Sequence, residues 1–388
     1  MAEPTTPDPG EHPAQVAARE VRRTWHLQSA LVPLYAVVLA LLVASVIILL
    51  VGGNPIEAYT ALLDGMFGTP DRINASLGRS TPFIGAALAV AFAFRAGLFN
   101  IGAEGQLLIG ATTAAWVGTF AWIADVPGPL ALVLVTLAGV LGGAFWGGIP
   151  GVLKAKTGAH EVITTIMLNS IAVLMVRWMV NSQDPVILRD VTSSVPRTEA
   201  LPRSVRLPVL IDTNPPLHLG FVIAVLLCVI VWFILRRTTF GFEVRTVGTN
   251  PDAARYAGMG VNRTIILVMA ISGAFAGIAG ASEITGTSGY LSPGVFVGIG
   301  FDAIAIALLA RANPFGIILT SILWGSMLSG AGLMQQESGL SINAVRIIQA
   351  LVLLFVAADV IVRTIFRVRE TGHSALDTTP VGSGWGTT

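Results

Sequence analysis

Long runs of apolar residues, separated by short polar stretches, dominate the pattern of this chain. A helix that crosses a bilayer needs about 20 mostly apolar residues, because lipid offers no partner for backbone polar groups. Runs of this kind predict about ten transmembrane helices. They cover residues 31–51, 80–95, 103–124, 128–153, 161–180, 217–235, 264–283, 297–311, 314–333 and 344–363. The pattern therefore predicts an all-α polytopic membrane protein.

Composition narrows the classes of function. Of the 388 residues only 12% are charged, about half of the roughly 25% found in soluble proteins. The net charge is +1, so no nucleic-acid partner is expected. Cys228 is the only cysteine, which excludes internal disulfides and cysteine-based metal clusters. An ordinary soluble enzyme, a disordered chain and a nucleic-acid binder are all excluded.

Basic residues predict the orientation, since Lys and Arg concentrate on the cytoplasmic side. They gather before the first run, after the fourth, between the sixth and seventh, and after the tenth: Arg19, Arg22, Arg23, Lys154, Lys156, Arg236, Arg237, Arg245, Arg255, Arg263, Arg363, Arg367 and Arg369. We therefore expect both termini to be cytoplasmic. A transmembrane domain over 31–363 lies between a disordered lead (1–30) and a disordered tail (364–388).

Two segments outside the runs are long enough to carry a function. The outer loop, 181–216, is rich in proline and should be ordered but not helical. It is either a plain connector or a docking surface for an external partner. The inner loop, 236–263, is the longest on the cytoplasmic side. In it, Asn250 should cap a short helix that starts at Pro251 and Asp252, and a glycine at 258 or 260 should end it.

A polar, glycine-rich stretch interrupts the apolar pattern between residues 95 and 106. It contains Phe99, Asn100, Glu104 and Gln106 together with three glycines. Non-helical backbone at membrane depth is tolerated only where it is buried in protein or lines a cavity. An acid inside the membrane is a functional candidate by default. Glu104 either lines a solute pathway or is bonded to a neighbouring helix at a tight junction.

A similar stretch recurs later in the chain. Gly294, Phe296, Gly298, Gly300 and Asp302 precede the apolar run that ends at Leu309. In both stretches Gly-x-Phe, further glycine and then an acid lead into an apolar helix. The copies lie five spans apart, and such an odd offset predicts inverted-topology repeats with a site at their interface. Asn169, in the middle of another run, is expected to bond between helices.

Several catalytic motifs are missing from the sequence. No Gly-x4-Gly-Lys-Ser/Thr phosphate loop is present, and the only lysines are Lys154 and Lys156. His-Glu-x-x-His, a Cys/His cluster and Gly-x-Ser-x-Gly are also missing. We therefore predict no catalytic residue, no metal site and no ATP hydrolysis by this chain.

Four segments, in this order, make the chain similar to a known family. They are Phe94-Arg-Ala-Gly-Leu-Phe-Asn-Ile-Gly-Ala-Glu-Gly-Gln106, Glu161-Val-Ile-Thr-Thr-Ile-Met-Leu-Asn169, Arg245-Thr-Val-Gly-Thr-Asn-Pro-Asp-Ala-Ala-Arg-Tyr-Ala-Gly258 and Gly300-Phe-Asp-Ala-Ile-Ala-Ile-Ala-Leu-Leu309. The chain resembles ABC importer permeases of the simple-sugar/nucleoside family, which are related to ribose and branched-chain amino acid permeases. Asp252 stands where the family's Glu-Ala-Ala-x-x-x-Gly loop usually has Glu.

The resemblance implies a vitamin-B12-importer-like (type II) permease with inverted repeats in a bacterial plasma membrane. It implies transport of nucleosides, or a related sugar-containing solute, by alternating access. The implied partners are a second permease subunit, a binding lipoprotein outside, and a cytoplasmic ABC ATPase that carries ATP and Mg. Contact with the ATPase would fall on Gly241, Arg245, Gly248, Asn250, Pro251, Asp252, Ala253, Ala254 and Gly258. The pathway candidates are Phe99, Asn100, Glu104, Gln106, Asn169 and Asp302.

Two alternatives stay open at this point. The chain could be a proton-coupled secondary transporter that acts alone and uses Glu104 and Asp302. It could also be an assembly subunit without a pathway of its own.

Overall fold

The computed structural model describes residues 35, 37–294 and 296–357. The lead (1–30) and the tail (364–388) that the sequence predicts lie outside these ranges. The chain divides into two compact units. One contains the helix Val37–Leu50 and α13 (Asn343–Ala357), and the other contains residues 56–340.

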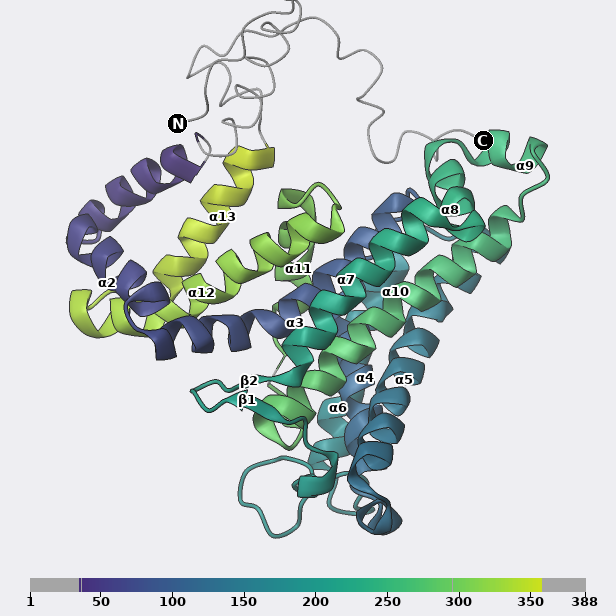
Figure 1. Cartoon of the computed structure of the whole chain (residues 1–388), viewed down its shortest axis with the longest axis horizontal. Helices are drawn as coiled ribbons and strands as arrows, with labels where there is room; N and C mark the ends of the chain where they lie inside the picture. Colours follow the sequence, from purple (N-terminus) through teal and green to yellow (C-terminus); the bar gives the residue numbers. More distant parts are fainter. Residues whose placement is uncertain (1–34, 36, 295, 358–388) are drawn as a thin grey trace, which may run out of the picture. The chain divides into compact units, whose positions relative to one another are not determined.

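The larger unit consists mainly of helices, with one small hairpin in its longest loop (Figure 1). Its α-helices are α2 (Pro55–Phe67), α3 (Pro70–Arg95), α4 (Ala103–Gly118), α5 (Gly128–Thr157), α6 (Glu161–Asn181), α7 (Leu219–Arg237), α8 (Thr239–Thr249), α9 (Pro251–Tyr256), α10 (Val261–Glu283), α11 (Ile299–Leu309) and α12 (Pro314–Ser338). Short 3₁₀ turns occupy Ala121–Asp125 and Arg203–Val205, and a π turn, Ile284–Ser288, extends α10. Strands β1 (Val209–Ile211) and β2 (Leu217–His218) pair antiparallel.

Among the residues that the structure describes, six helices are long and apolar enough to cross a membrane, namely α3, α5, α6, α7, α12 and α10 with its π extension. A polytopic helical fold is therefore confirmed. Each of the ten predicted runs contains a helix, but α4 has 16 residues and α11 only 11. Ten full spans thus stay a prediction. The run 80–95 was predicted too short, because Thr69 caps the helix at Pro70 and the polar residues 71–80 do not interrupt it.

Helix α3 forms the centre of the larger unit. Its membrane-length window is 83% buried, and it contacts α7, α10, α11 and α12. Thr69 accepts a hydrogen bond from the amide of Arg72, and Pro70 fills the first helical position. The helix ends at Arg95, where Gly97 takes φ +70. Residues 96–102 then form a non-helical link to α4.

Glycines bring the backbones of α5 and α10 into direct contact. A Cβ atom on Gly277 would lie 2.2 Å from the carbonyl oxygen of Gly139, and one on Gly273 would lie 2.2 Å from that of Gly143. Helix α4 joins them, because a Cβ on Gly110 would lie 2.4 Å from the Cα of Gly277. Such small-residue contacts are a main source of helix association in lipid. The glycines in these three runs therefore position the helices around the α3–α4 link.

The outer loop, 181–216, is ordered without a long helix, as its prolines predict. Its backbone is hydrogen-bonded to the segment after α10: the amides of Thr198, Leu201 and Leu207 donate to the carbonyls of Leu291, Gly289 and Thr285. The carboxylate of Asp190 accepts hydrogen bonds from the hydroxyl and amide of Thr192 at 2.5 and 2.9 Å. These bonds, with Arg197 nearby, hold the pKa of Asp190 below its usual range.

The smaller unit shows the burial expected of paired helices. In the helix Val37–Leu50 the residues Ala40, Ala44 and Ile48 are buried, and in α13 the residues Val345, Ile348 and Val352 are buried. The spacings of three and four residues place each set on one helix face.

Replacing Gly277 by Ala tests the close packing of α5 and α10. The added methyl group would overlap the carbonyl of Gly139, so we expect a destabilisation of about 1–3 kcal/mol. Gly148→Ala on α5 is the matched control, because its Cβ would meet only Ala270 at 3.9 Å. Thermal unfolding of the detergent-solubilised protein should show a lower Tm for Gly277→Ala alone. Equal Tm values for the two variants would contradict this packing.

Candidate functional site

The link between α3 and α4 is enclosed by buried polar side chains. Asn100 donates to the side-chain oxygen of Gln106 at 2.8 Å and to the hydroxyl of Ser272 at 2.7 Å. Its own side-chain oxygen accepts from Gln106 at 3.0 Å and from the amide of Gly102 at 3.0 Å. Ser272, on α10, donates to the carbonyl of Ala89 at 2.6 Å. Asn100 and Ser272 are fully buried.

Asn169 of α6 holds the same link from the other side. Its side-chain oxygen accepts from the amide of Gly105 at 2.8 Å, and its side-chain nitrogen donates to the carbonyl of Ile101 at 2.8 Å. The interruption leaves backbone groups without a partner in a helix. Asn169 provides an acceptor for the amide of Gly105 and a donor for the carbonyl of Ile101. The prediction that Asn169 bonds between segments is confirmed.

Glu104 connects the start of α4 to the start of α11. Its two carboxylate oxygens accept hydrogen bonds from the amides of Gly298 at 2.7 Å and Gly300 at 2.6 Å. These amides belong to the first turn of α11, where backbone N–H groups have no partner within the helix. A carboxylate at a helix N-terminus also interacts favourably with the helix dipole. Glu104 is therefore bonded to a neighbouring helix, as the structural alternative predicts.

The two glycine-rich stretches meet at this point. A Cβ on Gly300 would lie 2.2 Å from the backbone nitrogen of Glu104, so the two backbones touch. Gly298 takes φ +92 at the N-cap of α11, a conformation that favours glycine. Both acids of the repeat-like pattern, Glu104 and Asp302, lie in the first turn of a short helix. This arrangement fits the predicted interface of repeats, whereas the inverted symmetry stays a prediction.

The pathway candidates do not all belong to one cluster. Asn100, Glu104, Gln106 and Asn169 enclose the link and are at most 6% exposed. Phe99 is half-buried, and its ring packs against that of Phe94 with centroids 5.3 Å apart. Asp302 is half-buried on α11. The sequence analysis did not identify Ser272, because a serine in an apolar run carries no signal until the fold places it beside Asn100.

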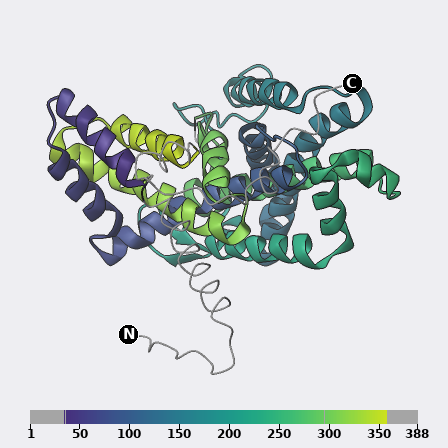
Figure 2. The ribbon, with the colours of Figure 1, turned by 90° about the horizontal axis from the view of Figure 1, so that it is seen from above.

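The inner loop folds into two short helices, α8 and α9, at the edge of the helix bundle (Figures 1 and 2). Asn250 caps α9 through hydrogen bonds from the amides of Asp252 and Ala253, both at 3.0 Å. The predicted capped helix is confirmed, with Pro251 and Ala254 buried. Gly258 follows it with φ +78, as a glycine after a helix end should.

Helix α8 is a further element that the sequence analysis treated as loop. Thr238 caps it by accepting from the amide of Gly241, and Val244 and Val247 are fully buried. Gly241 packs on the end of α7, since its Cβ would lie 2.0 Å from the carbonyl oxygen of Ile234. The Thr and Gly residues at the start of this segment are typical of turns, so the sequence did not predict a helix there.

Gly248 of α8 touches the end of α3. A Cβ on Gly248 would lie 2.3 Å from the carbonyl oxygen of Arg95, and one on Gly97 would lie 3.1 Å from that of Gly248. The inner helices therefore contact the backbone at the beginning of the interrupted segment. No sequence motif predicts this contact, because it pairs glycines about 150 residues apart.

Tyr256, at the end of α9, is 94% exposed. Next to it, the exposed side chains of Asp252 and Arg255 form an ion pair at 2.9 Å. An exposed aromatic residue on a short, firmly capped helix is the kind of anchor that protein interfaces use. The sequence analysis did not single out Tyr256, since only its exposure separates it from a packing residue.

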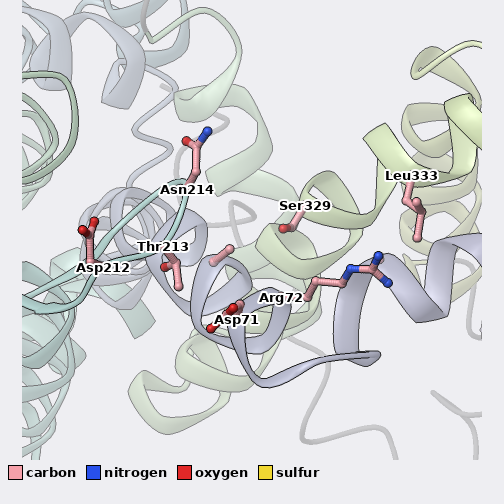
Figure 3. A pocket seen from close by; sticks show the side chains of 9 residues that line it. Asp71, Arg72, Asp212, Thr213, Asn214, Ser329 and Leu333 are labelled. Atoms are coloured by element: carbon pink, nitrogen blue, oxygen red, sulfur yellow. The ribbon is translucent and has the colours of Figure 1, made fainter.

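A cavity of about 350 Å³ lies beside the β1–β2 hairpin, which directly precedes α7, whereas α8 and α9 follow the other end of α7. Figure 3 shows the side chains that line it, which come from α3, the β1–β2 turn and α12. They are largely polar: Asp71, Arg72, Asp212, Thr213, Asn214 and Ser329 lie beside Gly65, Ala75 and Leu333. Arg72 is ion-paired with Asp64. The cavity could accept hydroxyl groups of a polar solute or polar groups of a protein partner.

These helices, with a polar interruption enclosed at their centre, define a polytopic membrane permease. Residues 72–357 match the model of the branched-chain amino acid transport system/permease component family. The chain belongs to this family, as the resemblance implied. No solved structure matched the chain.

Three relatives are similar over most of their length. The chain is 44% identical over 348 residues to the guanosine ABC transporter permease protein NupP of Bacillus subtilis, covering 88% of this chain and 96% of the relative. It is 36% identical to the nucleoside ABC transporter permease protein NupB of Lactococcus lactis, covering 86% and 92%. It is 34% identical to the glucose ABC transporter permease protein TsgB13 of Haloferax volcanii, covering 83% and 86%.

Glu104→Gln tests the bond between α4 and α11. An amide offers one acceptor oxygen where the carboxylate serves two backbone donors, so one buried N–H loses its partner at a cost of about 1–3 kcal/mol. We expect a lower Tm at neutral pH. Thr112→Val, in the same helix, is the control, because the Thr112 hydroxyl donates only to the carbonyl of Leu108 within α4. An unchanged Tm for Glu104→Gln would argue against the bond.

Proposed function

We propose that this chain is a permease subunit of an ATP-driven ABC importer that carries nucleosides across a bacterial plasma membrane, with both termini cytoplasmic. The observation that carries the proposal is the 44% identity, over nearly the whole chain, to a permease named for guanosine. A second relative named for nucleosides supports the same solute class. The relative named for glucose keeps a sugar-containing solute as the alternative.

We propose a heterodimer with a second permease subunit. The bacteria that carry NupP and NupB also carry permeases named NupQ and NupC, to which this chain is 27% and 28% identical. Two permeases named for the same solute in one bacterium support a pair of unlike subunits. The chain is more similar to NupP and NupB than to NupQ and NupC, which supports a role like that of NupP and NupB within the pair.

The other proposed partners are a cytoplasmic ABC ATPase, which would bind ATP and Mg, and a solute-binding lipoprotein outside. The capped helix α9 with its exposed Tyr256 supports docking to the ATPase. The polar cavity beside the β1–β2 hairpin and the ordered loop 181–216 support docking of the binding protein on the other face. These two surfaces support one protein partner on each side of the membrane.

The proposed mechanism is alternating access in a type II permease with ten helices and inverted repeats. ATP binding on the ATPase would move α9 and α8. Helix α8 would act on the end of α3 through the contact of Gly248 with Arg95 and Gly97. The interrupted segment would transmit the movement to α11, which Glu104 joins to α4. Each step of this route corresponds to a backbone contact or a buried hydrogen bond.

The geometry gives less support to a proton-coupled transporter that acts alone. A proton carrier must gain and lose its proton during each cycle. The Glu104 carboxylate instead joins two helices by accepting two short backbone hydrogen bonds. Releasing them at each protonation would detach the start of α11.

Uptake by the reconstituted complex tests the proposed solute class. The chain, its permease partner and the ATPase should be placed in liposomes with the binding protein outside and ATP inside. We expect ATP-dependent uptake of labelled guanosine that unlabelled adenosine reduces and excess glucose does not. Uptake of glucose alone would instead favour the sugar alternative. Guanosine uptake under a proton gradient without ATPase or ATP would contradict the importer.

Tyr256→Ala tests the proposed contact with the ATPase. Truncating an exposed aromatic anchor at an interface costs about 2 kcal/mol or more, so we expect the ATPase to co-purify at a small fraction of the normal level. Trp122→Ala is the control. Trp122 is also exposed, at 51%, but it lies in the 3₁₀ turn that follows the C-terminal end of α4 and not in the inner helices. Normal co-purification of the ATPase with Tyr256→Ala would argue against docking through α9.

A further inference from the structure

A second cavity, of about 400 Å³, lies where α3 and α7 end beside the middle of α8. Three arginines line it, each from a different helix: Arg95 from α3, Arg236 from α7 and Arg245 from α8. Trp232, Leu235, Asn313 and Pro314 complete the lining. We call this space the arginine cavity.

The three positive charges have no acidic partner in the lining. Arg95 donates to the carbonyl oxygen of Ala312 at 2.8 and 3.0 Å, which is a neutral acceptor. Within the described part of the chain, the guanidinium groups of Arg236 and Arg245 form no hydrogen bond or ion pair. Their charges repel that of Arg95. Converging like charges without a counter-ion cost free energy unless an anion is bound between them.

The chemistry of the lining favours one kind of anion. Arginine guanidinium groups match the oxygens of phosphate in a forked, two-point geometry. Asn313, beside them, adds a side-chain amide. A cavity of about 400 Å³ is large enough for a phosphate with substituents.

The position of the cavity indicates where such a phosphate comes from. Arg236 lies in the last turn of α7, a 19-residue membrane-length helix, on the side of the basic inner loop. Trp232 lies one turn earlier on α7 and packs against Phe315, with ring centroids 5.8 Å apart. Aromatic residues with adjacent arginines are typical of the membrane–water interface, and basic pockets between helices on the cytoplasmic side bind anionic headgroups.

We propose that the arginine cavity binds a phosphate group, supplied by the headgroup of an anionic phospholipid. The bound phosphate draws together α3, α7, α8 and the turn between α11 and α12 by neutralising their converging charges. Arg95 immediately precedes the segment that Gly248 of α8 contacts. The lipid therefore stabilises the junction between the inner helices and the interrupted segment. The binding itself does not depend on the solute that the permease carries.

The test uses the complete complex of this chain with its permease partner and ATPase, purified in detergent. Native mass spectrometry measures binding of dioleoyl-phosphatidylglycerol and of dioleoyl-phosphatidylcholine. We expect the wild type to retain phosphatidylglycerol selectively. The double variant Arg236→Gln/Arg245→Gln should bind it about tenfold or more weakly. The control Arg237→Gln/Arg263→Gln removes the same charge from residues outside the cavity lining and should bind it normally.

A second arm distinguishes the two sources of phosphate. Labelled pyrophosphate is added to the delipidated complex in equilibrium dialysis. Stoichiometric binding that the cavity variant loses, together with no lipid selectivity, keeps the phosphate site but assigns it to a soluble ligand. Equal binding of both lipids and of pyrophosphate by wild type and cavity variant would overturn the proposal. Loss of the ATPase from the cavity variant, with lipid binding unchanged, would also overturn it in favour of an acidic protein surface.

The conservative variant Arg236→Lys/Arg245→Lys guards against a folding artefact. It keeps both charges but removes the forked geometry, so we expect intermediate phosphatidylglycerol binding and a wild-type Tm. A misfolded double Gln variant would show a lower Tm than this variant and would then be replaced by the single variants. Phosphatidylglycerol binding at the full wild-type level in both single Gln variants and in the double Lys variant would contradict the proposal.

Discussion

The structure depends on one constraint: a backbone interrupted inside an apolar bundle must find partners for every polar group it releases. The link between α3 and α4 meets this constraint with side chains from elsewhere in the bundle, through Asn169 from α6 and Ser272 from α10. Glu104 meets the same need for α11, whose first amides it accepts. The polar residues in the membrane core therefore join helices as well as interrupting them.

Two sets of close backbone contacts lie next to this polar centre. On one side, the glycines of α4, α5 and α10 place these helices at minimal separation, which leaves little room for independent movement. On the other, Gly248 of α8 rests on the end of α3, next to the arginine cavity. In the proposed importer, α5 and α10 form the rigid body. The parts that move are the interrupted segment, the start of α4 and α11, which Glu104 joins to α4.

The sequence predicts the parts of this molecule better than their connections. Helical runs, the cap at Asn250 and the interruption near Gly97 each follow from local chemistry that a few neighbouring residues determine. The contact of Glu104 with Gly298, the approach of Gly248 to Gly97 and the meeting of three arginines join residues far apart in the chain. The local pattern of residues does not show which distant segments meet in the fold, so these contacts could not be predicted from it. Helix α8 was missed for a different reason, since its helical face becomes visible only through the burial of Val244 and Val247.

The central claim is that movement of the inner helices reaches α11 through the interrupted segment. Hydrogen–deuterium exchange of the complete complex, with and without a non-hydrolysable ATP analogue, tests it most directly. We expect peptides covering 248–258, 96–106 and 296–304 to change their exchange together when the nucleotide binds. A change confined to 248–258, with the other two segments unaffected, would contradict the account.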